Sequence, residues 1–285
     1  MCLVFCLSCK YQSNSKVFQV ETKEFTQSET TLSVEEFNDV FQEFLDRYVV
    51  VLKQDTYDTR VDYKKIAKDI ADKNDEYLGL RAQIESYFGS SAYDSLSDDG
   101  KVAFLINAYN FFVINLIADK YPIKSILDIP GGAFDQEIFN FKGGKAESLN
   151  QLEKEILKDV LVKKGKGKTD ARLHFALICG AMGCPILSDQ VYQEEILEKQ
   201  LETITQQAFE LPRIIEVKTK NYVLVELFSP GWYRKDFLNH SSPGLDKVED
   251  IYDFIAHYLP SGLQINRSYN ISIPDDYNWD LNEVK

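Results

Sequence analysis

The most apolar helix that the sequence predicts runs from Lys101 to about Lys120. Asp98 or Asp99 is placed to cap its start, and Pro122 ends it, because proline cannot continue a helix. Leu, Ile, Val and Phe fall on all sides of this helix rather than along one stripe. We expect its side chains to be largely buried.

Two asparagines, Asn107 and Asn110, interrupt this helix three residues apart. Buried amides need partners, and most of them bond backbone groups, here those of a neighbouring loop. The alternative is that one of them lines a pocket and donates to an oxyanion beside a thiol. Both are therefore candidates for substrate binding. Trp232 is a third candidate: we expect it mainly to pack, and it would line a substrate groove if it lies near the site.

The stretch from Arg172 to Pro185 carries the strongest chemical signal. It places His174, one of three histidines, five residues before Cys179, and Cys184 follows after five more. The apolar run ends at a glycine, which predicts a buried strand over 172–179 leading into a tight loop. A histidine in the core with thiols at the adjoining loop points to a nucleophile with its base, or to a metal site.

The two thiols have different expected surroundings. Pro185 suits the first position of a helix, which we expect to start at Pro185 or Ser188 and to end near Phe209. Cys184 would then lie near the start of this helix, where free N–H groups and the helix dipole stabilise a thiolate. Cys179 would end a strand and be buried and inert. This reasoning favours Cys184 as the reactive thiol, with Cys179 as the alternative.

Hydrophobic periodicity predicts the remaining elements. Ser33 and Glu36 form a capping box at the start of a helix. Further helices are expected at 63–70, 77–88, 148–160, 232–238 and 248–258, short strands or an extended loop at 123–147, two strands within 213–228, and an extended tail from residue 261. Together they predict one α+β domain over 32–285, with helices packed on a small, mainly antiparallel sheet.

Composition limits the partners. The 285 residues are 44% hydrophobic and 13% aromatic, which is enough for a substantial core. The formal net charge of −13 argues against nucleic acid or an anionic membrane surface as the main partner, because both require a basic footprint.

The first 31 residues predict an export segment. Cys2, Cys6 and Cys9 fall in the first nine residues and are followed by a polar stretch. This pattern resembles the end of a bacterial lipoprotein signal with Cys9 as the lipid-bearing residue, although a basic region is missing and the apolar run is short. We expect a truncated signal and tether at 1–31, membrane contact only through the anchor, and an exported, membrane-anchored or periplasmic protein. The alternative is a cytoplasmic one.

Over roughly residues 60–285 the chain resembles the DUF547 family of uncharacterised proteins. The motifs that carry the resemblance are Phe104–Asn110, Ser148–Glu153, His174–Pro185, Trp232–Phe237 and Tyr277–Asn282. The resemblance implies a papain-like or transglutaminase-like fold with a catalytic Cys-Glu-His set. The matching residues here are Cys184, Glu153 and His174, with the carboxylate expected to orient the imidazole.

The leading hypothesis is therefore a cysteine-dependent hydrolase or acyl-transferase that acts on an amide-like bond of a peptide-like or small-molecule substrate. Two alternative functions remain: a non-catalytic surface or periplasmic binding module, and an intracellular scaffold. Two other arrangements of the thiols also remain: a disulfide between Cys179 and Cys184, or a zinc site formed by His174, the two thiols and Glu153. The zinc alternative lacks a C-x-x-C or H-E-x-x-H pattern, and we expect no metal and no cofactor.

Overall fold

Helix α5 (Asp98–Lys120) is buried along most of its length, as its apolar sequence predicts, and forms the centre of the domain. Its aromatic side chains contact rings from several other elements: Phe104 packs on Phe37, and Phe111 packs on Phe41 and Phe44. By length and composition α5 could cross a membrane, but 94% of its most apolar window is buried in the protein's own core. The cap differs from the expectation: the Ser97 hydroxyl accepts from the backbone N–H of Gly100, and Asp98 and Asp99 lie in the first turn.

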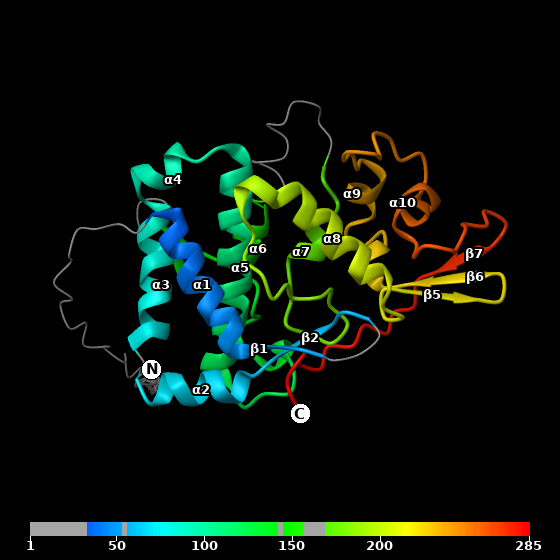
Figure 1. Ribbon diagram of the computed structural model, residues 1–285. Helices are drawn as coiled ribbons and strands as arrows, with labels where there is room; N and C mark the ends of the chain where they lie inside the picture. Colours follow the sequence, from blue (N-terminus) through cyan, green and yellow to red (C-terminus); the bar gives the residue numbers. More distant parts are fainter. Residues whose placement is uncertain (1–32, 53–55, 74, 142–144, 155, 157–168) are drawn as a thin grey trace, which may run out of the picture. The chain divides into compact units, whose positions relative to one another are not determined.

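The computed structural model describes residues 33–52, 56–73, 75–141, 145–154, 156 and 169–285 (Figure 1). From Ser33 onward they belong to one compact unit. The expected lipid anchor at Cys9 and the end of the predicted 148–160 helix lie outside the described residues. The export segment and the domain boundary near residue 31 stay predictions.

The N-terminal helices pack around α5. Helix α1 (Val34–Tyr48) begins with the predicted Ser33–Glu36 capping box and buries its apolar face. The elements that follow up to the described end of the 148–160 segment are α2 (Tyr63–Ala71), α3 (Asp75–Phe88), α4 (Ser91–Ser95), the 3₁₀ turn η1 (Ile126–Asp128) and α6 (Leu149–Lys154). Contacts of α5 with α2 and α6 place the segment before Glu153 beside the central helix.

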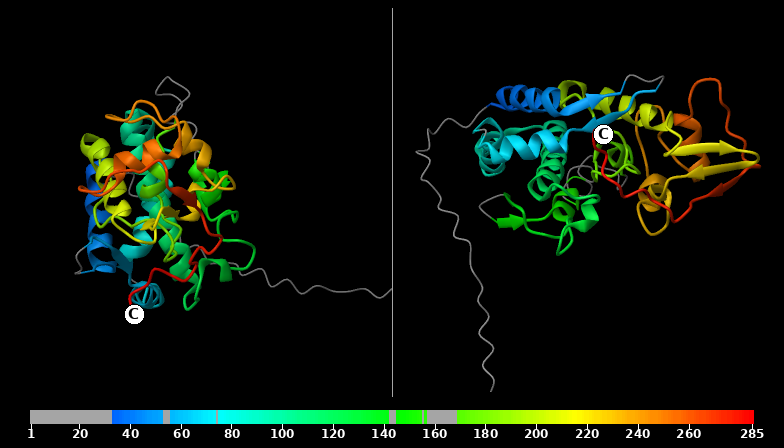
Figure 2. Two further views of the ribbon diagram at one scale, coloured as in Figure 1. Left: turned by 90° about the vertical axis from the view of Figure 1, so that its right-hand side faces the viewer. Right: turned by 90° about the horizontal axis from the view of Figure 1, so that it is seen from below.

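The strands form small separate sheets rather than one. The pairs are β1 (Val49–Val51) with β2 (Thr59–Val61), and β3 (Phe139–Phe141) with β4 (Lys145–Glu147), both antiparallel. The third sheet has the order β5 (Ile215–Lys218), β6 (Asn221–Leu224) and β7 (Asn270–Ser272). Strand β7 runs parallel to β6, and both figures show it beside the β5–β6 hairpin (Figures 1 and 2). The α+β class with mainly antiparallel pairing is confirmed.

Two predicted elements were wrong, and both adjoin the thiols. Residues 172–179 do not form a strand: α7 (Leu173–Ala176) is a single helical turn, and Leu177 then turns to an extended conformation. A short apolar run cannot distinguish a buried helical turn from a buried strand by periodicity alone. The helix expected from Pro185 or Ser188 begins only at the 3₁₀ turn η3 (Glu194–Ile196), which continues into α8 (Leu197–Phe209).

The reason for the late helix start is tertiary. Side chains from other elements bind the backbone of the preceding segment: Asn107 accepts from the N–H of Tyr192, and Gln42 accepts from the N–H of Val191. These bonds hold the segment in a non-helical form. They involve residues 85 and 149 positions away in the chain, which no local pattern can reveal.

The C-terminal region lies along the thiol loop. The 3₁₀ turn η4 (Glu226–Phe228), α9 (Arg234–Leu238) and α10 (Ile251–Tyr258) precede the tail. The tail is held by backbone bonds from the N–H of Met182 to the carbonyl of Asp280 (2.7 Å) and from that of Gly183 to Asn278 (2.8 Å). These contacts bring the tail against the two cysteines.

Candidate functional site

A small cavity of about 50 Å³ brings the predicted catalytic residues together. It is lined by Tyr109, Glu153, His174, Leu177, Ile178, Cys179, Cys184, Pro185, Leu227, Trp232, Tyr233 and Tyr277. Four of the six residues singled out from the sequence are among them, and Asn107 and Asn110 are not. The cavity therefore combines thiols, an imidazole, a carboxylate and several phenols around one small, partly open space.

The two asparagines of α5 bond backbone from the segments that flank the thiols. The Asn110 amide donates to the carbonyl of Ala176 (2.9 Å) and accepts from the N–H of Ile178 (3.0 Å). Asn107 makes the equivalent pair of bonds to Tyr192, both 2.9 Å long. Each amide thus fixes the position of its segment, which is the backbone role weighed above. Substrate binding by either residue stays a prediction.

The thiols lie next to each other across the loop that contains Gly180. The backbone N–H of Cys179 donates to the Cys184 sulfur (2.7 Å). Gly180 has φ = 75°, a left-handed conformation that glycine adopts without strain, and a Cβ there would collide with Ile117. The loop therefore depends on a glycine at this position to place the sulfurs side by side.

Cys179 is the more accessible and the more acidic of the two. Its side chain is half-buried, whereas Cys184 is 3% exposed. Burial alone would raise the pKa of the Cys179 thiol. Hydrogen bonds from the Cys184 thiol, the Tyr277 hydroxyl and backbone N–H groups outweigh burial and hold this pKa below its ordinary value. The pKa of Cys184 is raised well above the ordinary range by burial and by the neighbouring Cys179.

The expected helix start at Cys184 is absent. Pro185 and the residues after it up to Gln193 are not helical, so no helix dipole points at this sulfur. The physical basis for preferring Cys184 as the thiolate is therefore lost. The hydrogen bonds to its sulfur favour Cys179, the alternative thiol, and which of the two reacts stays a prediction.

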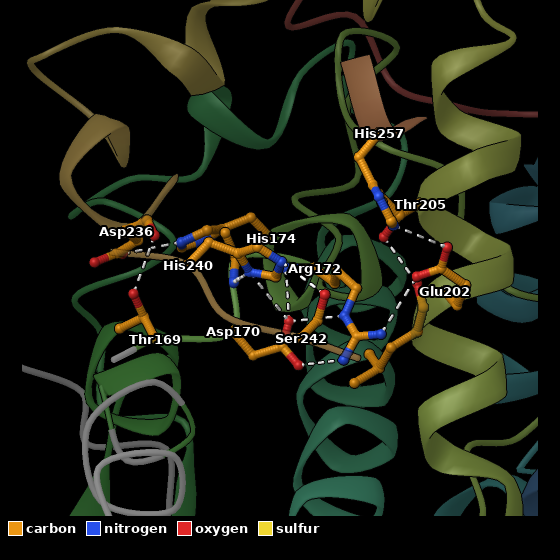
Figure 3. A network of polar contacts seen from close by, with 12 residues as sticks. Thr169, Asp170, Arg172, His174, Glu202, Thr205, Asp236, His240, Ser242 and His257 are labelled. Carbon is orange, nitrogen blue, oxygen red and sulfur yellow. Dashed lines mark hydrogen bonds and ion pairs between the residues drawn. The ribbon is translucent and has the colours of Figure 1, made fainter. Parts of the chain in front are cut away.

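His174 is held by an aspartate that the sequence did not single out as its partner. His174 Nε2 lies 3.0 Å from Asp236 Oδ2 (Figure 3). An ionised carboxylate only accepts, so Nε2 carries the proton and Nδ1 is left as the basic nitrogen. The imidazole also stacks on the Tyr233 ring, with centroids 3.9 Å apart. In the described part of the chain no hydrogen bond joins a thiol to His174; the groups face the same cavity.

Glu153 takes a different place from the one expected. Its carboxylate accepts a 2.6 Å hydrogen bond from the Tyr233 hydroxyl rather than binding His174. Burial and the nearby carboxylate raise the pKa of Tyr233, so this phenol stays protonated. Glu153 thus reaches the imidazole only through the tyrosine ring that stacks on it. The orienting carboxylate in this structure is Asp236.

Aromatic side chains from two distant segments form one wall of the site. The Tyr277 hydroxyl lies 3.2 Å from the Cys179 sulfur, and its ring packs on Trp232 and Trp279 at 5.1 and 4.7 Å between centroids. Burial and the two thiols raise the pKa of Tyr277 well above its ordinary value, so it is a hydrogen-bond donor to sulfur. The Tyr-Asn-Trp-Asp motif in the tail was the signal for this residue, but its target lies 98 residues away.

The structure also bears on the two other arrangements considered for the thiols. Both described cysteines, Cys179 and Cys184, are free thiols. Within the ranges that the structure describes, no group of three or more His, Cys, Asp and Glu side chains is arranged to hold a metal ion. The cavity is therefore read as a dithiol site beside a His–Asp pair.

The fold and the cavity define an α+β protein with a buried thiol site. Residues 93–208 match the model of the family described as "Protein of unknown function, DUF547". The chain thus carries a DUF547 domain, as its motifs predicted. No curated protein matches it. No solved structure matches it either, so the papain-like or transglutaminase-like fold stays a prediction.

The family match ends before two of the motifs that carried the resemblance. Trp232–Phe237 and Tyr277–Asn282 lie beyond residue 208, yet they supply Asp236 to His174 and Tyr277 to Cys179. The part of the chain that follows the matched residues therefore completes the cavity.

Proposed function

We propose that this protein is a thiol-dependent enzyme that cleaves or transfers an acyl group from an amide-like bond, with Cys179 as the nucleophile. One observation carries the proposal. A half-buried thiol of lowered pKa shares a small cavity with an imidazole that is oriented by a carboxylate. This is the set of groups that nucleophilic thiol catalysis requires.

The reaction follows from the groups present. The Cys179 thiolate attacks the carbonyl carbon, and a C–S bond forms as the carbonyl π electrons move to oxygen. When that oxyanion collapses, the C–N bond breaks, and His174 in its protonated form donates a proton to the leaving amine. Water or an acceptor amine then attacks the thioester, His174 removes its proton, and the thiolate is released. Asp236 keeps the imidazole in the orientation that leaves Nδ1 free for these transfers.

The remaining side chains adjust the nucleophile and the space around it. The Cys184 thiol and the Tyr277 hydroxyl donate to the Cys179 sulfur and stabilise its charged form. Tyr233, fixed by Glu153, supports the flat face of His174. Trp232 contributes an apolar surface for the substrate. The volume of about 50 Å³ fits a narrow reacting group, such as a single carbonyl with its small substituents.

The first test measures thiol reactivity in the intact protein. Iodoacetamide is added at about pH 6, below the ordinary thiol pKa of roughly 8.5, and the labelled peptide is identified by mass spectrometry. We expect fast, stoichiometric labelling at Cys179. Cys179→Ala abolishes it, and Cys184→Ala slows it without abolishing it, because the variant lacks one donor to the thiolate.

The second test measures acyl transfer with p-nitrophenyl acetate. We expect a burst of p-nitrophenol and an acetylated Cys179, both lost in Cys179→Ala and reduced in His174→Ala. The matched control is Cys184→Ala, which retains the nucleophile.

Two results would overturn the assignment. Labelling and acetylation at Cys184, with loss in Cys184→Ala alone, would return the nucleophile to that residue. Labelling no faster than free cysteine, together with no acetylated protein, would exclude a nucleophilic enzyme and leave the cavity as a binding site.

A further inference from the structure

The buried thiol of Cys184 has only an indirect part in the acyl transfer proposed above, where it donates to the nucleophile. Its sulfur accepts from the backbone N–H of Cys179 (2.7 Å), and its S–H donates to the Cys179 sulfur. The two sulfurs are therefore in direct hydrogen-bond contact. Two thiols in contact can also react with each other, because an oxidant can convert them to a disulfide.

The backbone on both sides of the thiol pair is held in place. The N–H of Cys184 donates to the carbonyl of Ala181 (3.1 Å), and Arg213 Nε donates to the carbonyl of Cys184 (3.1 Å). Ahead of the first thiol, Asn110 accepts from the N–H of Ile178 (3.0 Å). Groups that are fixed in contact react as though each were at a very high concentration. The fold therefore favours a reaction between these two sulfurs over one with a thiol in solution.

The two thiols differ in the properties that peroxide chemistry requires of each partner. An accessible thiolate attacks a hydroperoxide, and a neighbouring thiol then captures the sulfenic acid that results. Cys179 is half-buried; burial opposes its charge, but hydrogen bonds from Cys184 and Tyr277 outweigh burial and lower its pKa. Cys184 is 3% exposed, and burial together with the nearby Cys179 raises its pKa, so it stays a thiol. Cys179 thus suits the oxidised position and Cys184 the capturing one.

The size of the cavity limits the oxidants that can reach Cys179. Its volume of about 50 Å³ holds a few water molecules, each of which needs roughly 10–15 Å³. Hydrogen peroxide has two heavy atoms and fits this space, whereas a thiol the size of glutathione does not. Trp232 and Tyr277 line the same space with large rings. A sulfenic acid at Cys179 is therefore out of reach of bulky thiols and in contact with Cys184.

We propose that Cys179 and Cys184 form a peroxide-oxidisable pair, in which a small hydroperoxide oxidises Cys179 and Cys184 then closes a reversible disulfide. First, the Cys179 thiolate attacks one peroxide oxygen, an S–O bond forms as the O–O bond breaks, and the other oxygen leaves as hydroxide, which takes a proton from solvent. Next, the Cys184 sulfur attacks the Cys179 sulfur, the S–O bond breaks, and the departing hydroxide takes up the Cys184 proton. The peroxide is reduced to two waters, and the two thiols are oxidised.

The effect of this oxidation on activity rests on the function proposed above. A disulfide at Cys179 removes the nucleophile, so acyl transfer stops on oxidation. It resumes when a dithiol reductant such as dithiothreitol reduces the bond. The disulfide itself forms whether or not the protein transfers acyl groups.

The test treats the reduced full chain with hydrogen peroxide and measures by mass spectrometry the tryptic peptide 173–199, which contains both thiols. We expect this peptide to lose two hydrogen atoms and dithiothreitol to restore them. Oxidation of Met182 in the same peptide adds an oxygen instead, so the mass separates the two reactions. Acetylation of Cys179 by p-nitrophenyl acetate should fall to near zero with peroxide and recover with dithiothreitol.

Cys184→Ser is the matched variant, because its hydroxyl can still donate to the Cys179 sulfur but cannot form a disulfide. Peroxide should then convert Cys179 to a sulfenic acid, which dimedone traps, and further to sulfinic and sulfonic acids that dithiothreitol does not reduce. Acetylation of this variant is therefore lost on oxidation without recovery. Cys184→Ala should behave in the same way, and Cys179→Ala should show neither a disulfide nor a dimedone adduct in this peptide.

A peptide 173–199 that keeps both thiols after peroxide treatment overturns the proposal. So does equal recovery of acetylation in the wild type and Cys184→Ser, since Cys184 is then not the thiol that captures the sulfenic acid. Failure of the proposed function gives a different result: the reduced protein is not acetylated, while the disulfide in peptide 173–199 still forms.

Discussion

The segment 169–184 contributes to two groups of buried polar side chains. They differ in whether the polar atoms are all hydrogen-bonded within the protein. In one, Arg172 is 1% exposed and its guanidinium donates to Asp170 and Glu202 (Figure 3). It also donates to Glu198. In the other, the thiols and His174 surround a cavity. In the first cluster, the N–H groups of Arg172 donate to carboxylates of the same protein. The second leaves space beside reactive groups.

The buried histidines of the two clusters, His240 and His174, differ in the same way. His240 accepts from the N–H of Ala171 at Nδ1 (3.0 Å) and meets the Ser242 hydroxyl at Nε2 (2.9 Å), so both ring nitrogens are engaged. His174 is equally buried, but only Nε2 has a partner among the described residues. A ring with both nitrogens bonded supports structure, whereas one with a free basic nitrogen can transfer protons. Both histidines are buried, so burial does not distinguish them. The ring nitrogen of His174 that has no hydrogen-bond partner among the described residues does.

The largest expected effect is that of Arg172→Met. It removes the buried guanidinium and leaves three partly exposed carboxylates without their cation, so the free energy of unfolding should fall by about 3 kcal/mol. Urea unfolding of both proteins measures the difference. A loss below about 1 kcal/mol would mean that the hydrogen bonds of Arg172 contribute little to the stability of the fold.

Asp58→Asn tests a second cluster in which a carboxylate is bonded by arginines. This cluster contacts the backbone of Cys184. Asp58 bonds Arg213 and Arg60, and Arg213 Nε donates to the carbonyl of Cys184 (3.1 Å). Removing the charge should cost about 2–3 kcal/mol at neutral pH.

The stability difference between the wild type and Asp58→Asn should depend on pH. Burial opposes the charge of Asp58, but the two guanidinium groups outweigh it and lower its pKa. The stabilisation is therefore present above the pKa of the unfolded chain, roughly 4, and is lost as the pH falls through the lower folded value. Urea midpoints of the wild type and Asp58→Asn should converge in acid. A difference that is constant with pH would contradict the assignment.

His240→Ala and His174→Ala sharpen the comparison directly. The first removes two buried hydrogen bonds and should lower the free energy of unfolding by about 2 kcal/mol, with acetylation of Cys179 unchanged. The second should cost less stability and reduce acetylation. Urea unfolding and mass spectrometry on both variants provide the two readouts. If His240→Ala reduced acetylation as much as His174→Ala, the difference in free nitrogens would not be the functional one.

The smallest expected effect is that of Glu198→Gln. Its side chain is 53% exposed, and the amide oxygen still accepts from Arg172. The loss should stay below about 1 kcal/mol in urea unfolding. A larger loss would show that the full negative charge at this position is needed to hold the buried cation.

Much of the helical fold could be predicted from the sequence. The capping box at Ser33, the apolar face of α1 and the apolar surface of α5 are local patterns, and the helices they predict are present. The two strands expected within 213–228 are present as β5 and β6, and Lys220 in the turn between them is in the left-handed conformation. The late start of α8 could not be predicted, because Asn107 and Gln42 hold the preceding backbone from distant helices.

By itself the sequence identified the segment that contributes most to the candidate site: His174, Cys179 and Cys184 all lie within Arg172–Pro185, and all three line the cavity. Only the tertiary structure decided which groups act on them. Asp236 reaches His174 across 62 residues, and Tyr277 reaches Cys179 across 98. Local patterns determine helices and caps because those depend on neighbours a few residues away. The pKa of a thiol and the tautomer of an imidazole depend on burial and on hydrogen-bond partners. Folding supplies these partners from segments that are distant in the sequence.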